Sequence, residues 1–155
     1  MVKATLLLFI ALLVGCSSEE MREGALHLRL DGIDADSPVG ADAVVAAEAW
    51  NLACGRKIIV WENDGVPVRR VKSFPEGSPK DRRGLFTPAG YDAGGTRIEF
   101  MAIQSSAGRQ SLFAHEFGHA LGLDHNEGHS VMNEDTSLHL MPTSSDCDGV
   151  LYVGE

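Results

Sequence analysis

Apolar and polar residues alternate along two stretches of the chain, and this pattern predicts strands with one buried face. In residues 24–30 three leucines fall on one side of the strand, whereas His27 and Arg29 fall on the other. Residues 96–103 alternate in the same way. Successive side chains of a strand point to opposite faces of the sheet, so each stretch offers one apolar face to a core.

Other apolar patterns predict two helices and several shorter elements. Residues 40–54 are rich in alanine and precede Gly55, which favours a helix end there. Residues 109–121 carry apolar side chains on most of their surface and predict a largely buried helix. The remaining expectations are a central strand at 56–61, a hairpin partner at 66–71, a short strand at 84–87, loops at 31–42, 73–83 and 104–108, and a final helix at 146–152.

Three histidines have a spacing that suits one metal ion. Residues four positions apart lie on one face of an α-helix, so His115 and His119 direct two imidazoles to the same point. Gly122 tolerates a positive φ and ends the helix, and the turn returns His125 as a third ligand. Three protein ligands with one open position are typical of catalytic zinc. The pattern predicts one catalytic Zn²⁺ held by these histidines.

Glu116 is expected to act on a water molecule at this site. It follows the first ligand directly but projects in another direction, where its carboxylate can accept a proton from a zinc-activated water. The alternative is a buried helix that merely carries a few histidines, and the ligand spacing argues against it. His129 and His139 lie nearby in sequence, but we expect them at the surface or behind the ligands, because three ligands suffice.

Residues 115–125 contain H-E-x-x-H-x-x-G-x-x-H, and Ser130-Val131-Met132-Asn133 follows shortly afterwards. Together they resemble the metzincin zinc endopeptidases, whose signature joins this motif to a methionine-containing turn. The resemblance implies that Met132 lies in a tight turn beneath the zinc; Met141 is a weaker candidate. It also implies an α+β fold over residues 24–155, with a twisted, mostly parallel sheet, an antiparallel edge strand, a zinc helix, the Met-turn and a short C-terminal helix.

The resemblance further implies hydrolysis of peptide bonds in a protein or peptide substrate, with Glu116 as general base. It assigns residues 96–103 to the sheet edge above the cleft, where an extended peptide adds by main-chain hydrogen bonds; the alternative is an ordinary internal strand. A non-catalytic zinc-binding envelope lipoprotein is the main functional alternative. The presence of Glu116 argues against it, because metal retention alone does not require that carboxylate.

The first residues are expected to direct the chain to a membrane and not to join the fold. Lys3 is followed by an apolar run that is too short to span a bilayer as a helix. The run ends in Leu-Val-Gly-Cys at Cys16, which resembles a bacterial lipobox. That resemblance implies a lipoprotein signal peptide at 1–15, lipidation of Cys16, a tether at 16–23 and anchoring at the outer membrane of the cell envelope. An ordinary secretory signal is the alternative.

The chain has three cysteines, and two remain if Cys16 is lipidated. Cys54 and Cys147 then form one candidate pair, which an oxidising envelope permits. Two buried free thiols are the alternative. Neither cysteine has the C-x-x-C spacing of a metal site.

A net charge of −9 argues against nucleic-acid binding, which requires a basic surface, and we expect no nucleic-acid partner. Carboxylates in the 31–42 loop offer oxygen ligands for structural Ca²⁺, but they do not follow the EF-hand spacing, so a solvated loop is the preferred interpretation. The length suits one compact domain, which we expect to be a monomer.

Overall fold

The computed structural model describes residues 24–135 and 140–150. The signal peptide at 1–15, Cys16, the tether at 16–23, His139 and the end of the predicted final helix lie outside these residues. Within them, neither helix is long and apolar enough to cross a bilayer.

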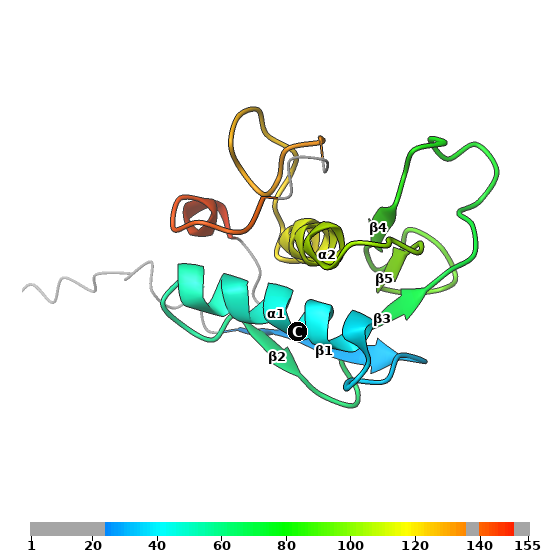
Figure 1. The fold of residues 1–155 in the computed structure, drawn as a ribbon, viewed down its shortest axis with the longest axis horizontal. Coiled ribbons are helices and arrows are strands. Elements are labelled where there is room, and N and C mark those ends of the chain that lie inside the picture. Colours follow the sequence, from blue (N-terminus) through cyan, green and yellow to red (C-terminus); the bar gives the residue numbers. More distant parts are fainter. Residues whose placement is uncertain (1–23, 136–139, 151–155) are drawn as a thin grey trace, which may run out of the picture.

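A five-stranded sheet forms one layer of the molecule, and two helices cover one of its faces (Figure 1). The strand order is β2-β1-β3-β5-β4, and only β4 runs antiparallel to its neighbour. A mixed α+β architecture with a mostly parallel sheet and an antiparallel edge strand is therefore confirmed. The strands are β1 (Leu26–Asp31), β2 (Ile59–Trp61), β3 (Val66–Arg70), β4 (Gly84–Thr87) and β5 (Arg97–Phe100).

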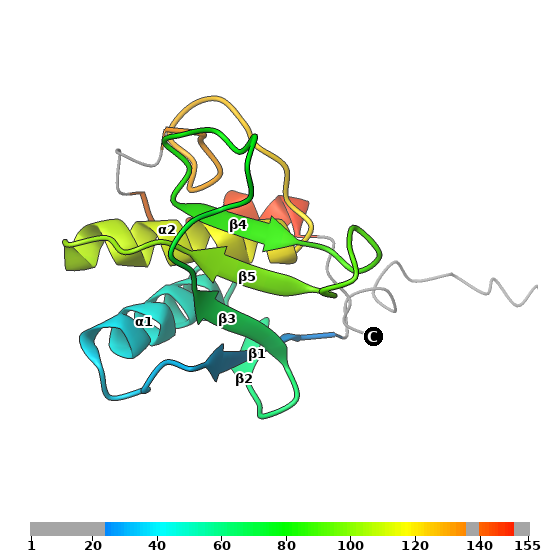
Figure 2. The same ribbon diagram turned by 90° about the vertical axis from the view of Figure 1, so that its right-hand side faces the viewer.

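Three expectations about strand position were wrong. Residues 56–61 were expected in the centre of the sheet, but β2 forms one edge, as Figure 2 shows. Its apolar run is buried by α1 above it and not by strands on both sides. Residues 66–71 are not a hairpin partner, because β3 runs parallel to β1 on the side opposite β2. Residues 96–103 are not an edge, because β4 pairs with the outer side of β5.

The connection from β2 to β3 crosses over β1. Trp61 at the end of β2 and Val66 at the start of β3 both lie level with Leu28, one on each side of β1. A Cβ atom at Gly65 would lie 2.7 Å from the His27 carbonyl oxygen, so the crossing requires a residue without a side chain. Residues 62–65 form a turn, closed by the Gly65 N–H donating to the Glu62 carbonyl at 3.3 Å, and this turn carries the chain across β1 and not into a hairpin.

Both helices begin earlier than the sequence pattern suggested. α1 spans Pro38–Ala53, and the Ser37 side chain caps it by accepting from the Gly40 backbone N–H. α2 spans Ser106–Ala120, with Ser105 as its cap, so residues 104–108 are not simply a loop. A serine followed by small residues can start a helix as readily as it forms a loop, and here tertiary packing selects the helix.

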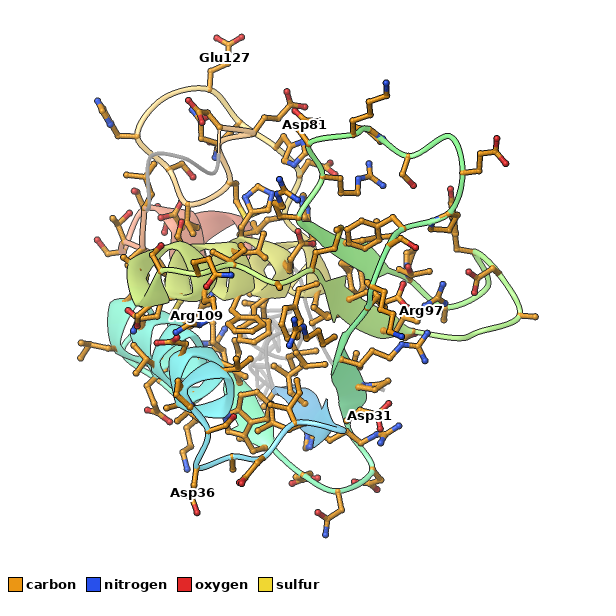
Figure 3. The ribbon with its side chains drawn as sticks, turned by 45° about the vertical axis from the view of Figure 1, so that its right-hand side comes forward. Asp31, Asp36, Asp81, Arg97, Arg109 and Glu127 are labelled. Carbon is orange, nitrogen blue, oxygen red and sulfur yellow. A yellow bond between two sulfur atoms is a disulfide. The ribbon has the colours of Figure 1, made fainter. Side chains whose placement is uncertain are left out.

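The two helices lie side by side on the sheet, and the core fills the space between the layers (Figure 1). Phe113 of α2 meets Phe100 of β5 edge-on at 4.8 Å between ring centroids. Arg109 of α2 donates to Asp42 of α1 at 2.6 Å, which joins the helices at their polar margin (Figure 3). Asp42 is thus used inside the fold and is not part of a solvated loop.

The opposite face of the β5 region is polar. Ile98 and Phe100 are buried in the core, as their alternation predicted, and Arg97 and Glu99 point to the other face. There Arg97 donates to Asp92 at 2.6 and 2.7 Å, and Arg69 donates to Glu99 at 2.7 Å. Figure 3 shows Arg97 on the side of the sheet away from α1. The paired charges let this face remain partly covered by the flanking loops.

The C-terminal segment is shorter and tighter than predicted. In place of a helix over 146–152, the described residues form a 3-10 helix, η2, at Asp146–Gly149. Gly149 disfavours continuation of a helix. Cys147 in η2 is joined to Cys54 after α1 by a disulfide that links positions 93 residues apart.

Candidate metal centre

α2 presents the first two histidines and Glu116 from its last turns. His115 is buried and His119 is half-buried. The helix ends before Gly122, whose φ of 89° turns the chain. A positive φ disfavours other residues, so glycine suits this position. The turn brings the exposed His125 back beside the other two rings.

The Nε2 atoms of the three histidines form a nearly equilateral triangle. The distances are 3.2 Å from His115 to His119, and 3.1 Å from His125 to each of the others. Nitrogen ligands of tetrahedral zinc, with bonds of roughly 2.0–2.1 Å, lie about 3.3–3.4 Å apart, so this triangle needs only a slight widening. The three histidines could hold a metal ion.

Each ring is oriented from behind through its Nδ1 atom. His115 Nδ1 donates to the Val131 carbonyl at 2.8 Å, and His119 Nδ1 donates to the Leu123 carbonyl at 2.8 Å. A carbonyl oxygen can only accept, so these Nδ1 atoms carry the proton and both Nε2 atoms present lone pairs.

The third ring has a carboxylate behind it instead. His125 Nδ1 lies 3.1 Å from Glu134 Oε1. With all three Nδ1 atoms engaged by acceptors, three lone pairs converge on one point, and such an arrangement favours a cation between them.

Burial favours the neutral form of the two histidine rings on α2. Burial lowers the pKa of His115 to about 4, although its bond to the Val131 carbonyl acts in the opposite direction. Burial also lowers the pKa of His119. Both imidazoles are therefore unprotonated at Nε2 near neutral pH, which is the state that binds a metal.

Glu116 lies between α2 and the edge strand β4. Its side chain is buried, and burial raises the pKa of its carboxyl to about 8; the facing Phe86 backbone N–H and the Arg82 charge act in the opposite direction. A Cβ atom at Gly84 would lie 2.7 Å from Glu116 Cδ, so β4 approaches the carboxyl very closely. An acid in such a place exchanges protons near neutral pH.

A cleft of about 600 Å³ connects the ligands with Glu116 and the edge strand. Its lining includes His115, His125 and Glu116, together with Gly84 and Leu85 of β4. Its rim carries charges of both signs from Asp81, Arg82, Arg83, Glu134 and Asp135. Figure 3 shows Asp81 at the upper end of the molecule, on the segment that leads into β4.

Residues 130–133 form a tight turn behind His115. The Asn133 backbone N–H donates to the Ser130 carbonyl at 3.0 Å, which closes the turn. Met132 is buried in it and packs against Gly118 of α2, where a Cβ atom would meet the Met132 sulfur. Val131 of the same turn supplies the carbonyl that orients His115.

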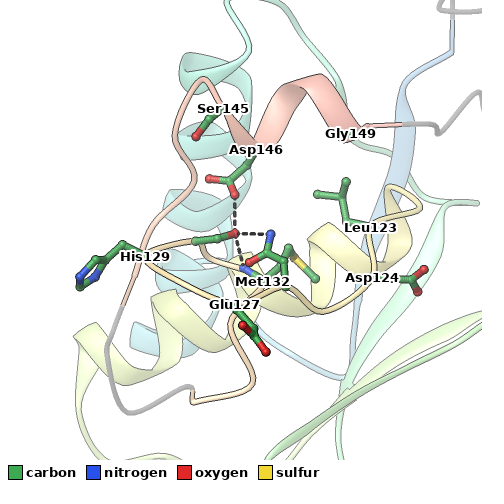
Figure 4. A pocket seen from close by; sticks show the side chains of 10 residues that line it. Leu123, Asp124, Glu127, His129, Met132, Ser145, Asp146 and Gly149 are labelled. Carbon is green, nitrogen blue, oxygen red and sulfur yellow. Dashed lines mark hydrogen bonds between the residues drawn. The ribbon is translucent and has the colours of Figure 1, made fainter.

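Asp146 of η2 holds this turn from the other side, as Figure 4 shows. The Ser130 hydroxyl donates to Asp146 at 2.6 Å, and the same oxygen accepts from the Met132 backbone N–H at 3.0 Å. Asp146 also accepts from the Thr143 backbone N–H and hydroxyl, each at 2.8 Å. The disulfide at Cys147 follows directly, so the turn behind the first ligand is linked to α1 through η2.

Several supporting residues were not anticipated from the sequence. The sequence predicted Gly84 only as the start of a short strand and Asp146 only as the start of a helix, and it gave Glu134 no role. Their contacts depend on how the loops after α2 and strand β4 fold back on the site, so spacing alone carries no signal for them. Ser130 lies inside the quoted turn motif, where only Met132 received a role.

The other candidates do not join the cluster. His129 is exposed and lies outside the ligand triangle, as expected. Among residues 24–135 and 140–150, the three ligand histidines are the only group of three or more His, Cys, Asp or Glu residues whose donor atoms converge within 4.8 Å. No acidic cluster that could hold Ca²⁺ forms in the described part of the 31–42 segment.

Comparison with known proteins leaves this geometry as the main guide to function. No protein-family model matches the chain, and no curated protein matches it either.

Proposed function

We propose that this chain is a zinc-dependent endopeptidase of the metzincin type. One observation carries the proposal: three imidazole lone pairs converge beside a buried glutamate, in a cleft that is open along the edge of a sheet. The H-E-x-x-H-x-x-G-x-x-H motif and the buried methionine turn at 130–133 support the same assignment.

His115, His119 and His125 would hold the ion through Nε2, with their Nδ1 atoms anchored as described. Zinc bound there would lower the pKa of a water and polarise a peptide carbonyl. Three neutral nitrogen ligands leave the ion its positive charge, and the carbonyls behind His115 and His119 fix the direction of their rings.

Glu116 is the proposed general base. Its carboxylate lies in the same cleft as two of the ligands and is shielded from bulk solvent. It would take a proton from the attacking water and then deliver it to the leaving amine of the cleaved peptide bond. A pKa near neutrality suits both transfers, because the group must accept the proton and release it within one turnover.

The outer edge of β4 is the proposed substrate-binding strand, in place of residues 96–103. The Arg83 carbonyl accepts from the Met101 backbone N–H at 2.8 Å, so at residue 83 the chain directs its polar groups toward the β5 side. Backbone groups alternate in direction along a strand, so those of Gly84 and Phe86 point away from β5. The Phe86 N–H faces the Glu116 carboxyl, which leaves the Gly84 groups and the Phe86 carbonyl for an added strand. An extended polypeptide can pair with this edge and cross the cleft.

A variant comparison tests the proposal. Glu116→Gln should retain one zinc per chain, measured by elemental analysis, while cleavage of a peptide library falls at least about a hundredfold. Glu127→Gln, an exposed carboxylate in the loop after His125, serves as the matched control and should cleave normally.

Removal of the metal provides the second arm of this test. A chelator should abolish cleavage, and added Zn²⁺ should restore it. A zinc-loaded wild-type protein that cleaves no peptide would instead support the non-catalytic zinc-binding alternative. Unchanged cleavage by Glu116→Gln would remove this residue from the mechanism.

We further propose that the protein is a lipoprotein of the bacterial envelope, anchored at the outer membrane through Cys16. The proposal rests on the lipobox-like sequence at residues 13–16. The mature wild-type protein should carry acyl chains by intact mass and fractionate with outer membranes. Cys16→Ser should lose both properties; membrane association that survives the substitution would contradict the anchor.

A further inference from the structure

We infer that Gly84 is a positioning residue for Glu116. The missing side chain at this point of the edge strand lets β4 lie against the carboxyl group and keep it in the cleft. The inference rests on the proposed role of Glu116, but the contact itself can be tested without any activity.

The contact is close and involves the whole end of the glutamate side chain. A Cβ atom on Gly84 would lie 2.7 Å from Glu116 Cδ and 2.8 Å from Cγ, and it would be closer still to Oε1. These distances are shorter than real Cβ contacts, so one partner would have to move.

Strand β4 cannot move easily, so the glutamate side chain would have to shift, and its burial restricts that shift. Glu116 is only 5% exposed and projects from a helix whose neighbouring residues are also buried. Gly84 pairs with Phe100, and that ring packs edge-on against Phe113 of α2. Core contacts through β5 therefore hold β4 in place relative to α2.

Backbone conformation does not explain a glycine here. The φ angle of Gly84 lies outside the positive range that other residues avoid, unlike that of Gly122. Alanine could adopt this extended conformation, and it would reduce the freedom of the unfolded chain. The close approach to Glu116 is the structural feature that requires glycine at this position.

A Cβ atom would displace the carboxyl group relative to the metal ligands. The rings of His115 and His119 are oriented by the carbonyls of Val131 and Leu123, whereas the atoms nearest a Cβ at Gly84 all belong to the Glu116 side chain. Gly84→Ala should therefore leave the metal affinity within about twofold of the wild-type value, while the general base is misplaced. A misplacement of about 1 Å can cost a factor of a hundred in rate.

The first test is a kinetic comparison on one peptide substrate. Gly84→Ala should lower kcat at least about tenfold and change KM much less. The visible absorption spectrum of the Co²⁺-substituted protein should keep the intensity of a four-coordinate site. If kcat/KM fell by the same factor through a higher KM, with kcat unchanged, Gly84 would be assigned to substrate pairing and the positioning role would be overturned.

The second test is a stability cycle on metal-free protein, followed by urea unfolding. Gly84→Ala should raise the unfolding equilibrium constant about tenfold in the wild type, because overpacking is destabilising. The same substitution should act similarly in the Glu116→Gln background, where the side chain has the same size. In the Glu116→Ala background it should have almost no effect.

Gly149→Ala is the control for this cycle. A Cβ there would meet Leu123 Cδ2 at 2.8 Å, away from Glu116, so its effect should be the same in all three backgrounds. An effect of Gly84→Ala that is also independent of the residue at 116 would overturn the inference. This outcome does not depend on whether the protein is a peptidase, and the double variant with Glu116→Ala keeps the cycle measurable if Gly84→Ala alone does not fold.

Discussion

The three ligand histidines occupy different surroundings. His115 is buried at the cleft wall, His119 is half-buried, and His125 is exposed with the exposed Glu134 carboxylate behind it. A ligand held by a buried carbonyl keeps one orientation, whereas an exposed carboxylate can rotate away. The metal would therefore enter and leave on the His125 side of the triangle.

Glu116 should make metal-free protein less stable as the pH rises. Its folded pKa of about 8 lies above the ordinary value of 4.5. Between these two values the unfolded chain has released the proton while the folded chain retains it, so unfolding becomes more favourable by about 1.4 kcal/mol per pH unit. Below pH 4.5 both states are protonated at Glu116 and this loss of stability is absent. Above pH 8 both states are ionised and the loss has reached its full size.

The measurement compares wild type with Glu116→Gln in the presence of a chelator. Urea unfolding from pH 5 to pH 8.5 should show the variant gaining a few kcal/mol relative to wild type. Glu76→Gln, in an exposed loop, is the control. Parallel pH curves for wild type and Glu116→Gln would contradict the buried, protonated carboxyl.

Gly118 should not tolerate alanine, despite its place inside α2. Alanine in a helix normally gains about 1 kcal/mol over glycine. Here a Cβ atom would meet the Met132 sulfur and lie 3.1 Å from Trp50 Cζ2, and overpacking costs about 1–3 kcal/mol. We expect a net loss of stability in urea unfolding of Gly118→Ala. A gain would mean that the turn at Met132 has room to move.

Among the elements, α2 was the most predictable. Its ligand spacing and the helix stop at Gly122 depend on local geometry, which the sequence expresses directly. Its first turn was missed because Ser105 and the small residues after it favour a loop and a helix start equally. The alternation in residues 96–103 correctly predicted which side chains of β5 face the core.

Strand positions were predicted less well, because they depend on contacts between distant segments. The apolar run before Trp61 has the same appearance in a central strand as in an edge strand covered by a helix. Gly84 to Thr87 carries little pattern of its own, yet it forms the edge that lines the cleft. The partners of Asp146 and Glu134 were not predicted because they depend on how irregular loops fold, which has no regular sequence pattern.

The turn at 130–133 should transmit changes in η2 to the metal centre. Asp146→Asn replaces one acceptor oxygen of a carboxylate that holds Ser130 and Thr143. Ser130 directly precedes Val131, whose carbonyl orients His115. We therefore expect zinc affinity to fall about tenfold, which is the lower end of the effects seen for groups that orient metal ligands. Competition with a chromophoric chelator measures this change.

Asp148→Asn is the matched control, since its side chain is exposed two residues away. It should leave zinc affinity unchanged. Equal affinities for wild type and Asp146→Asn would show that the turn keeps its shape without η2.

At the scale of the whole molecule, the disulfide closes a long segment of chain. It joins Cys54 to Cys147 across 93 residues, and so encloses most of the sheet and the candidate metal centre. A cross-link of this length stabilises by roughly 2–5 kcal/mol, mainly by restricting the unfolded chain.

The paired substitution Cys54→Ser with Cys147→Ser should lower the urea midpoint accordingly. A reductant should lower the midpoint of the wild type to the same value and leave the double variant unaffected. Insensitivity of the wild type to reductant under unfolding conditions would contradict the bond.

The passage of residues 62–65 over β1 affects the order in which the sheet can open. With β2 on one side, β3 on the other and Gly65 against the His27 carbonyl, β1 cannot leave until the crossing is undone. Amide hydrogens of β1 should therefore exchange with deuterium only through global unfolding, whereas those of β4 should exchange through local opening. Mass spectrometry of deuterated fragments should find that protection against exchange falls from β1 through β3 and β5 to β4, the strand that lines the cleft.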